Sequence, residues 1–145
     1  MPERTTLREV RLVLPMVAEM EIAATKAATS LAASIGMSPD RIDEVRMAVV
    51  EACINAFEHS GAPDSKVYID LEVRGTAGKP EELTITIRDR GIGFDPGTLP
   101  NPSIEQKLKA KRKRGWGLKI IEGLMDAVEI HSGAEGTTVK MSKRR

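Results

Sequence analysis

The sequence is poor in several residue types that would point to particular classes of protein. Its 145 residues include one cysteine, two histidines, one tryptophan, one tyrosine and two phenylalanines. A single cysteine excludes an internal disulfide and a zinc site built from cysteines, and two histidines are too few for a zinc site built from histidines. Because aromatic side chains are so few, the hydrophobic core must be aliphatic.

Long apolar runs and a strong net charge are also missing. No stretch approaches the roughly 20 apolar residues that a membrane-spanning helix needs, and the N-terminus lacks the basic start and apolar stretch of a secretory signal. The formal net charge of +1 gives no overall field that would steer the molecule to nucleic acid or to an anionic membrane. We therefore expect a cytoplasmic protein with no membrane partner and no direct nucleic-acid partner.

The first half of the chain predicts one strand and two helices within a single domain spanning residues 1–145. Alternating apolar and polar residues predict a strand over Leu7–Leu14, at an edge of the sheet. Alanine-rich helical spacing predicts a helix over Met16–Ile35. Ser38 is the expected N-cap of a second helix, which reaches about His59.

The second half predicts four more strands and one more helix. Lys66–Arg74 and Glu82–Arg88 alternate as an antiparallel strand pair, and a helix is expected from Gly115 onward. The last two strands are predicted over Val128–His131 and Thr137–Met141. Because neighbouring strands are grouped and do not each alternate with a helix, the order favours an α+β fold, a two-layer sandwich in which a mixed sheet carries its helices on one face.

Two polar residues of the second helix could carry chemistry. Glu51 and Asn55 are four positions apart, so they lie on one face of the helix, beside a row of alanines. A glutamate can accept a proton from a hydroxyl, and an asparagine carbonyl oxygen suits Mg²⁺. An isolated pair of this kind is more often a solvated helix face. Cys53 falls on the apolar stripe of the same helix and is expected to be a buried thiol, not a nucleophile.

Two glycine-containing segments could bring backbone close to a ligand. Asp89 follows a strand and precedes Gly91 and Gly93, which permit positive φ and close backbone approach. Gly115 and Gly117 stand where a helix begins, so its free N–H groups could receive phosphate. Each segment taken alone also fits an ordinary turn or helix start.

A basic run over Lys107–Arg114 precedes the second pair of glycines. It could screen a triphosphate, although such a run is usually a solvated, mobile face. Nucleic-acid binding through it is disfavoured because the run holds no aromatic side chain for stacking on bases. Threonine hydroxyls at the start of the last strand, Gly136–Val139, could hydrogen-bond a base, and Lys143–Arg145 is a short basic tail.

Together and in order, these segments resemble the Bergerat-fold (GHKL) ATPases, a superfamily that includes gyrase, histidine kinases and MutL. In its length and its sequence motifs the chain is most similar to the anti-sigma-factor serine kinases of the RsbW and SpoIIAB kind. The resemblance covers nearly the whole chain. The matching stretches are Glu51–His59, Asp89–Asp95, Arg114–Leu118, Leu124–Asp126 and Gly136–Val139.

The resemblance implies a role for each matching polar residue. Glu51 would be the general base that takes the proton from an attacking serine hydroxyl, and Asn55 would hold Mg²⁺ against the phosphates of ATP. Asp89 would accept a hydrogen bond from the adenine amino group. Thr137 would support Asp89 through its hydroxyl and a water, with Thr138 as the alternative.

The same resemblance implies a mobile lid over about residues 96–114 that closes on ATP or ADP. Glycines on either side of the lid would shape the pocket and cradle the phosphates, and one of two basic residues at its end would contact the γ-phosphate. The further residues implied in nucleotide binding are Gly91, Gly93, Lys113, Arg114, Gly115 and Gly117.

The function implied by the resemblance is that of an anti-sigma factor and protein-serine kinase. It would use Mg-ATP to phosphorylate a small antagonist protein with a STAS domain, and it would sequester a sigma factor as a homodimer. One alternative is a switch kinase of the same fold that activates a phosphatase and binds no sigma factor. Another is a regulatory module that holds nucleotide with little transfer, against which the intact Glu51 argues.

Overall fold

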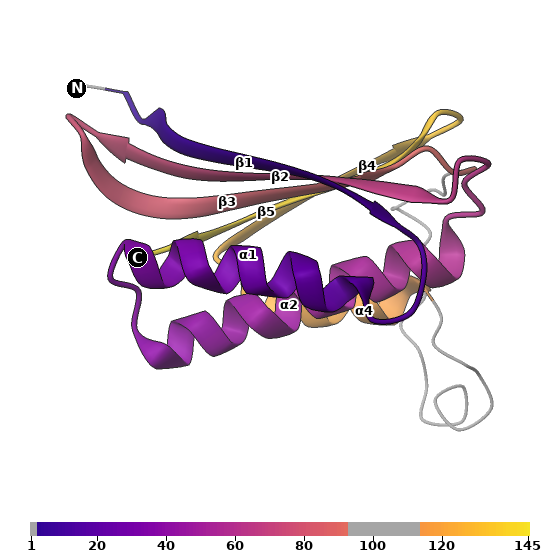
Figure 1. Ribbon diagram of the computed structural model, residues 1–145, viewed down its shortest axis with the longest axis horizontal. Coiled ribbons are helices and arrows are strands. Elements are labelled where there is room, and N and C mark those ends of the chain that lie inside the picture. The colour runs from indigo at the N-terminus through magenta and orange to yellow at the C-terminus, as the bar shows by residue number, and fades with distance from the viewer. Residues whose placement is uncertain (1–2, 93–113) are drawn as a thin grey trace.

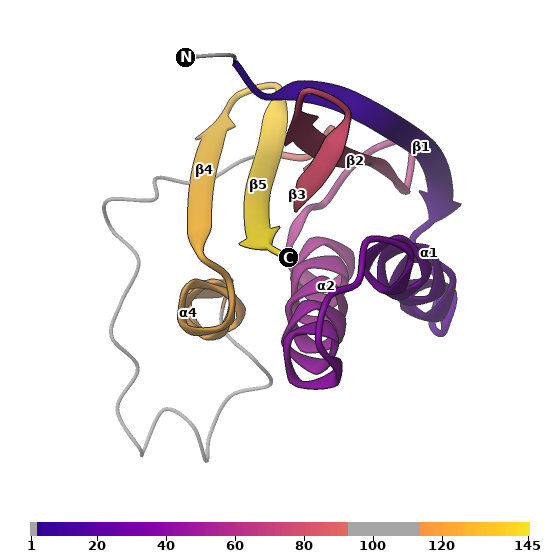
Figure 2. The same ribbon diagram turned by 90° about the vertical axis from the view of Figure 1, so that its left-hand side faces the viewer.

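A computed structural model describes residues 3–92 and 114–145 of the chain. The described strands form one sheet, and the described helices pack against one of its faces, as Figure 1 and Figure 2 show. This part of the chain is therefore the predicted two-layer α+β sandwich. In chain order the elements are β1 (Thr5–Pro15), α1 (Met20–Ser34), α2 (Pro39–His59), β2 (Lys66–Thr76), β3 (Lys79–Asp89), α4 (Arg114–Leu124), β4 (Ala127–Gly133) and β5 (Gly136–Arg144).

The strands lie in the order β1-β2-β3-β5-β4, and every pair of neighbours among the described strands is antiparallel. The prediction of a mixed sheet is therefore wrong. Two helices lie between β1 and β2 and bring the chain back along the sheet, which makes this pair antiparallel. β3 and β4 do run in the same direction, but β5 lies between them and is antiparallel to both.

The first helix begins later than predicted. The sequence favours a helix over Met16–Ile35, but α1 starts at Met20. The backbone N–H of Met16 donates to the carbonyl oxygen of Ser65 at 2.8 Å, and Glu19 has a φ of 80°. The chain is thus tied to a neighbouring loop and turned through a left-handed residue before the helix can start.

The second helix, α2, lies between α1 and α4 in the helical layer (Figure 2). The Ser38 hydroxyl accepts a hydrogen bond from the N–H of Arg41 at 3.4 Å, and Pro39 takes the first helical position. The predicted N-cap is confirmed. The row of alanines on this helix is buried, because α1 and α4 pack closely against it. The buried residues of α2 are Val45, Ala48, Val49, Ala52, Cys53, Asn55 and Ala56.

The hydrophobic core lies between the sheet and the helices. It is built from aliphatic side chains, as the scarcity of aromatic residues predicts, and the opposite face of the sheet carries mainly charged and hydroxyl groups. None of the described helices is both long enough and apolar enough to cross a membrane. The largest fully buried side chains include those of Ile69, Leu71, Leu83, Ile85, Leu118, Ile121 and Met141.

The last strand is longer than predicted. β5 extends to Arg144, so the basic residues at its end belong to the sheet, and their interpretation as a tail is wrong. Lys143 lies opposite Leu83 of β3 and is only 4% exposed. The N–H of Arg144 donates to Oδ2 of Asp126 at 2.7 Å. Side chains continue to alternate between the two faces of the sheet through these charged residues. Lys143 therefore faces the helical layer, whereas Arg144 faces away from it.

Candidate functional site

Asn55 and Glu51 lie one turn apart on α2. Asn55 is buried, with 6% of its surface exposed, and Glu51 is half-buried. The side-chain oxygen Oδ1 of Asn55 is buried and accepts no hydrogen bond from any residue that the structure describes. A buried polar atom left without a partner costs about 1–3 kcal/mol. This oxygen is therefore positioned to interact with a ligand, and an amide oxygen is a suitable ligand for Mg²⁺.

The first turn of α4 lies against the same two residues. Gly117 is buried, and a Cβ placed on it would lie 3.5 Å from Oε2 of Glu51 and 3.6 Å from Cβ of Asn55. The first four N–H groups of a helix have no acceptor within the helix, and they form its positive end. Because α4 starts at Arg114, these groups belong to the turn that holds Gly115 and Gly117. The prediction that the glycines stand at a helix start is confirmed.

Asp89 ends β3 and is buried, with 6% of its surface exposed. Its Oδ1 accepts a hydrogen bond from the N–H of Gly91 at 2.9 Å. Gly91 lies directly on the end of α2, because a Cβ there would be 2.0 Å from the carbonyl oxygen of Ser60. The same oxygen accepts a hydrogen bond from the N–H of Ile92 at 3.0 Å. Gly91 is thus required for close approach of two backbones, and it does not have a positive φ.

Thr137 lies directly opposite Asp89 in the ladder between β3 and β5, and both residues are buried. Its Oγ1 is 2.7 Å from Oγ of Ser132, on the neighbouring strand β4. Thr138 is half-buried and faces the other side of the sheet, since side chains alternate along a strand. Of the two threonines, Thr137 is therefore the one that shares a face with Asp89.

The structure adds Ser60 and Ser132 to the residues predicted from the sequence. Ser60 is completely buried, and its hydroxyl accepts a hydrogen bond from the N–H of Ala62 at 3.0 Å. The sequence signal that could have identified Ser60 is its position directly after the second helix and before a glycine. Ser132 carries no such signal, because only the strand pairing brings it to Thr137.

Some predicted site residues lie outside the described part of the chain. Gly93 and Lys113 are among them, and so is the predicted lid except for its last residue. For Arg114 and Gly115 the structure describes the backbone, as the start of α4.

Cys53 is buried in the core on α2, as predicted. Burial, and to a smaller extent the negative charge of Glu21, raise the pKa of its thiol to about 12. The thiol therefore stays protonated at neutral pH, which excludes it as a nucleophile there.

A hollow of about 590 Å³ lies at the ends of β3, β4 and β5. Its lining includes Tyr68 and Arg90, and the Arg90 guanidinium stacks 4.5 Å from the centre of the Tyr68 ring. The Tyr68 hydroxyl donates to Asp64 at 2.6 Å, and this hydrogen bond lowers the pKa of Asp64 and raises that of Tyr68. Glu51 and Asn55 are not part of this lining. Asp89 and Ser132 do line it, so the hollow adjoins the end of the candidate site at Asp89 and excludes the polar groups at the α2–α4 contact.

The chain is similar to several known proteins. The family model described as the histidine kinase-like ATPase domain matches residues 14–143. The chain is 34% identical over 140 residues to an anti-sigma F factor of Oceanobacillus iheyensis, covering 94% of this chain and 92% of that protein. It is 33% identical over 119 residues to the serine-protein kinase RsbW of Bacillus licheniformis, covering 79% of this chain and 72% of that protein.

A similar fold occurs among solved structures. A Mycobacterium tuberculosis protein, solved as its RsbU and RsbW domains, matches with a TM-score of 0.67 and 22% identity. The match covers 94% of this chain and 32% of that one, so this chain spans about a third of the other's length. At this identity the likeness concerns the fold alone.

Proposed function

Since the chain belongs to the histidine kinase-like ATPase family, in the group that holds anti-sigma F factors and serine-protein kinases RsbW, we propose that it is an ATP-dependent protein-serine kinase and an anti-sigma factor. The observation that carries the proposal is the buried Oδ1 of Asn55, which has no hydrogen-bond partner within residues 3–92 and 114–145 and lies one turn from Glu51, against the first turn of α4. A hard oxygen donor, a carboxylate and a positive helix end at one place are what phosphoryl transfer requires.

The buried polar groups suit a magnesium nucleotide. Asn55 would supply one oxygen ligand to Mg²⁺, whose other ligands are commonly phosphate oxygens and waters. The bound Mg²⁺ would neutralise charge on the phosphates, and the N–H groups at the start of α4 would receive phosphate oxygens. Asp89, at the end of β3, would accept a hydrogen bond from the adenine amino group, and Thr137, opposite it on β5, would support Asp89 through its hydroxyl and a water.

Glu51 is the proposed general base. Its carboxylate would accept the proton of a serine hydroxyl while the serine oxygen attacks the γ-phosphorus of ATP and the bond from that phosphorus to the β-phosphate oxygen breaks. The products would be phosphoserine and ADP. The half-buried position of Glu51 supports this role, because a carboxylate in that setting is partly shielded from water and still reachable from outside.

The proposed phosphoacceptor is a small antagonist protein with a STAS domain. The second proposed partner is a sigma factor, which a homodimer of this chain would bind in the cytoplasm. Support for these partners comes from the relatives, one named an anti-sigma F factor and another a serine-protein kinase.

The test is transfer from radiolabelled Mg-ATP to the antagonist, together with capture of the sigma factor by the purified chain. Glu51→Gln is expected to keep nucleotide affinity and to lose transfer, because the amide cannot take the proton. Glu58→Gln is the matched control, since Glu58 is exposed on the same helix. Equal transfer by Glu51→Gln and the unmodified chain would refute the base assignment.

Two outcomes separate the wider alternatives. Absence of both phosphoserine and sigma-factor capture would refute the proposed function. Phosphoserine without sigma-factor capture would instead identify a switch kinase.

A further inference from the structure

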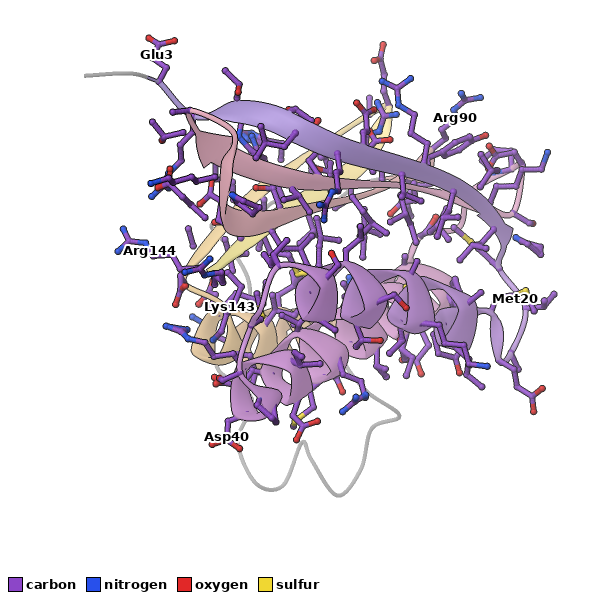
Figure 3. The ribbon with its side chains drawn as sticks, turned by 60° about the vertical axis from the view of Figure 1, so that its left-hand side comes forward. Glu3, Met20, Asp40, Arg90, Lys143 and Arg144 are labelled. Carbon is purple, nitrogen blue, oxygen red and sulfur yellow. The ribbon has the colours of Figure 1, made fainter. Side chains whose placement is uncertain are left out.

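Lys143 is a buried lysine at a point where three elements meet. It lies on the helix-facing side of β5, where Figure 3 shows it at the end of the sheet beside the helices. Its Nζ donates to the carbonyl oxygen of Leu124 at 2.5 Å, in the last turn of α4, and to Oε2 of Glu44 on α2 at 3.1 Å. Lysines are seldom fully buried unless they are paired, because removing the charge from water is costly.

The two contacts of Lys143 fix one end of α4 relative to α2. At the other end of α4, Gly117 lies against Glu51 and Asn55. The two helices therefore run antiparallel, and the anchored carbonyl of Leu124 is about 10 Å along the helix axis from Gly117 at 1.5 Å per residue. A short, hydrogen-bonded helix moves as one body, so a displacement at its anchored end is transmitted to its first turn.

The ammonium group also suits its position chemically. The last carbonyl groups of a helix have no intrahelical donor, and they form its negative end, where a cation is stabilising. The chain beyond α4 has a separate attachment, since the N–H of Asp126 donates to the carbonyl oxygen of Ser142 at 2.9 Å. That bond fixes the segment after the helix, whereas Lys143 ties the helix end itself to α2.

We propose that Lys143 is a positioning residue, which anchors the C-terminal end of α4 to Glu44 so that the first turn of α4 is held against Glu51 and Asn55. It touches no reacting atom in this role. The effect on nucleotide binding rests on the proposed function, because it takes the phosphates to lie at the first turn of α4.

Lys143→Met is the informative variant. Methionine keeps most of the apolar stem and loses both hydrogen bonds, and replacing a buried charge of an ion pair by an apolar side chain of similar volume need not destabilise a fold if the partner stays hydrated. Glu44 meets this condition, with 39% of its side chain exposed. Lys140→Met is the matched control, because Lys140 is exposed on the same strand.

The experiment measures Mg-ATP affinity by calorimetry and hydrogen exchange of the backbone amides of α4, with the full chain. Lys143→Met is expected to bind Mg-ATP about tenfold more weakly, the order of magnitude of one lost charge-assisted hydrogen bond, and to exchange the amides of α4 faster. Lys140→Met is expected to match the unmodified chain in both. Lys143→Arg keeps the charge and the donors, so it should recover part of the affinity.

The outcomes separate this inference from the proposed function. Unchanged affinity and unchanged exchange in Lys143→Met would overturn the positioning role, as would an affinity loss fully explained by a smaller folded fraction in circular dichroism. If the unmodified chain binds no Mg-ATP, the proposed function fails. The exchange of α4 in the nucleotide-free chain then decides the anchoring role by itself, with faster exchange supporting it and equal exchange refuting it.

Discussion

Replacing Gly91 with alanine is expected to destabilise the fold and to disturb the loop that follows Asp89. The added Cβ would lie 2.0 Å from the carbonyl oxygen of Ser60, whereas ordinary van der Waals contacts begin at 3.4 Å. The obstacle is backbone, so it cannot turn aside as the end of a side chain can. The two backbones must separate by more than about 1 Å, which matches the overpacking seen when methyl groups are forced into tight sites.

The cost of Gly91→Ala can be built from two contributions. Separation breaks the hydrogen bond from Ile92 N–H to Ser60, which is 3.0 Å long, and such a bond contributes about 1 kcal/mol net. Residual strain of overpacking adds about 1–3 kcal/mol. The free energy of unfolding should therefore fall by about 2–4 kcal/mol. Affinity for an adenine nucleotide should fall too, because the N–H of Gly91 holds Oδ1 of Asp89.

Urea denaturation followed by circular dichroism measures the first effect, and titration with a fluorescent ATP analogue measures the second. Gly123→Ala is the matched control, because nothing lies within 4 Å of a Cβ at this position of α4. Alanine is favoured over glycine in a helix by about 0.8–1 kcal/mol, so the control should stabilise the chain. A Gly91→Ala chain within about 0.5 kcal/mol of the unmodified one would refute the close backbone contact.

Two further predictions concern buried groups of α2. Asn55→Leu removes a buried oxygen that has no partner in the described part of the chain, so it should raise the free energy of unfolding by about 1 kcal/mol. It should also abolish magnesium-dependent nucleotide binding. Denaturation and calorimetry check the two effects, and retained Mg-ATP binding would exclude Asn55 as a ligand. Cys53 has a pKa raised from 9.0 to about 12 in the fold, so the unfolded chain loses the thiol proton first. Stability should therefore fall as pH rises from about 9 to about 12, by up to about 1.4 kcal/mol per pH unit from this group alone. Comparison with Cys53→Ala in urea isolates that contribution, and equal pH slopes would contradict it.

Much of the fold could be predicted because its signals are local. The N-cap at Ser38 and the apolar spacing that follows define α2 almost to the residue. Alternation likewise defines the strands on either side of the turn that ends at Lys79. Both patterns follow from the period of a helix or of a strand, and they need no knowledge of the neighbouring elements.

The errors in the fold come from contacts between distant residues. α1 begins at Met20 because the N–H of Met16 is bonded to Ser65, and neither the bond nor the left-handed φ of Glu19 has a sequence pattern. Lys143 resembles part of a basic tail until its partners Glu44 and Leu124 are known. Strand direction was likewise not encoded in any single segment.

The site could be predicted as far as its residues fall into short segments. Three of its residues stand in short sequence motifs that resemble those of a family, and all three are buried: Asn55, Asp89 and Thr137. Ser132 could not be predicted because a single serine within a strand has no pattern, and the only signal for Ser60 was its place between the second helix and a glycine. Ser60 belongs to the site because its backbone contacts Gly91, and Ser132 belongs to it because strand pairing brings it next to Thr137.

The position of β5 between β3 and β4 has a consequence for how the chain folds. Until β5 is in place, both of those strands present an open edge, and open edges are where other chains pair and aggregate. Pairing of β3 with β5 joins Asp89 to Thr137 across 48 positions of sequence, and contacts of such long range slow folding. The step that covers the open edge of β3 is thus the same step that brings Asp89 next to Thr137. Substitutions that weaken β5 are expected to reduce the yield of folded chain through aggregation before they alter the nucleotide affinity of molecules that do fold.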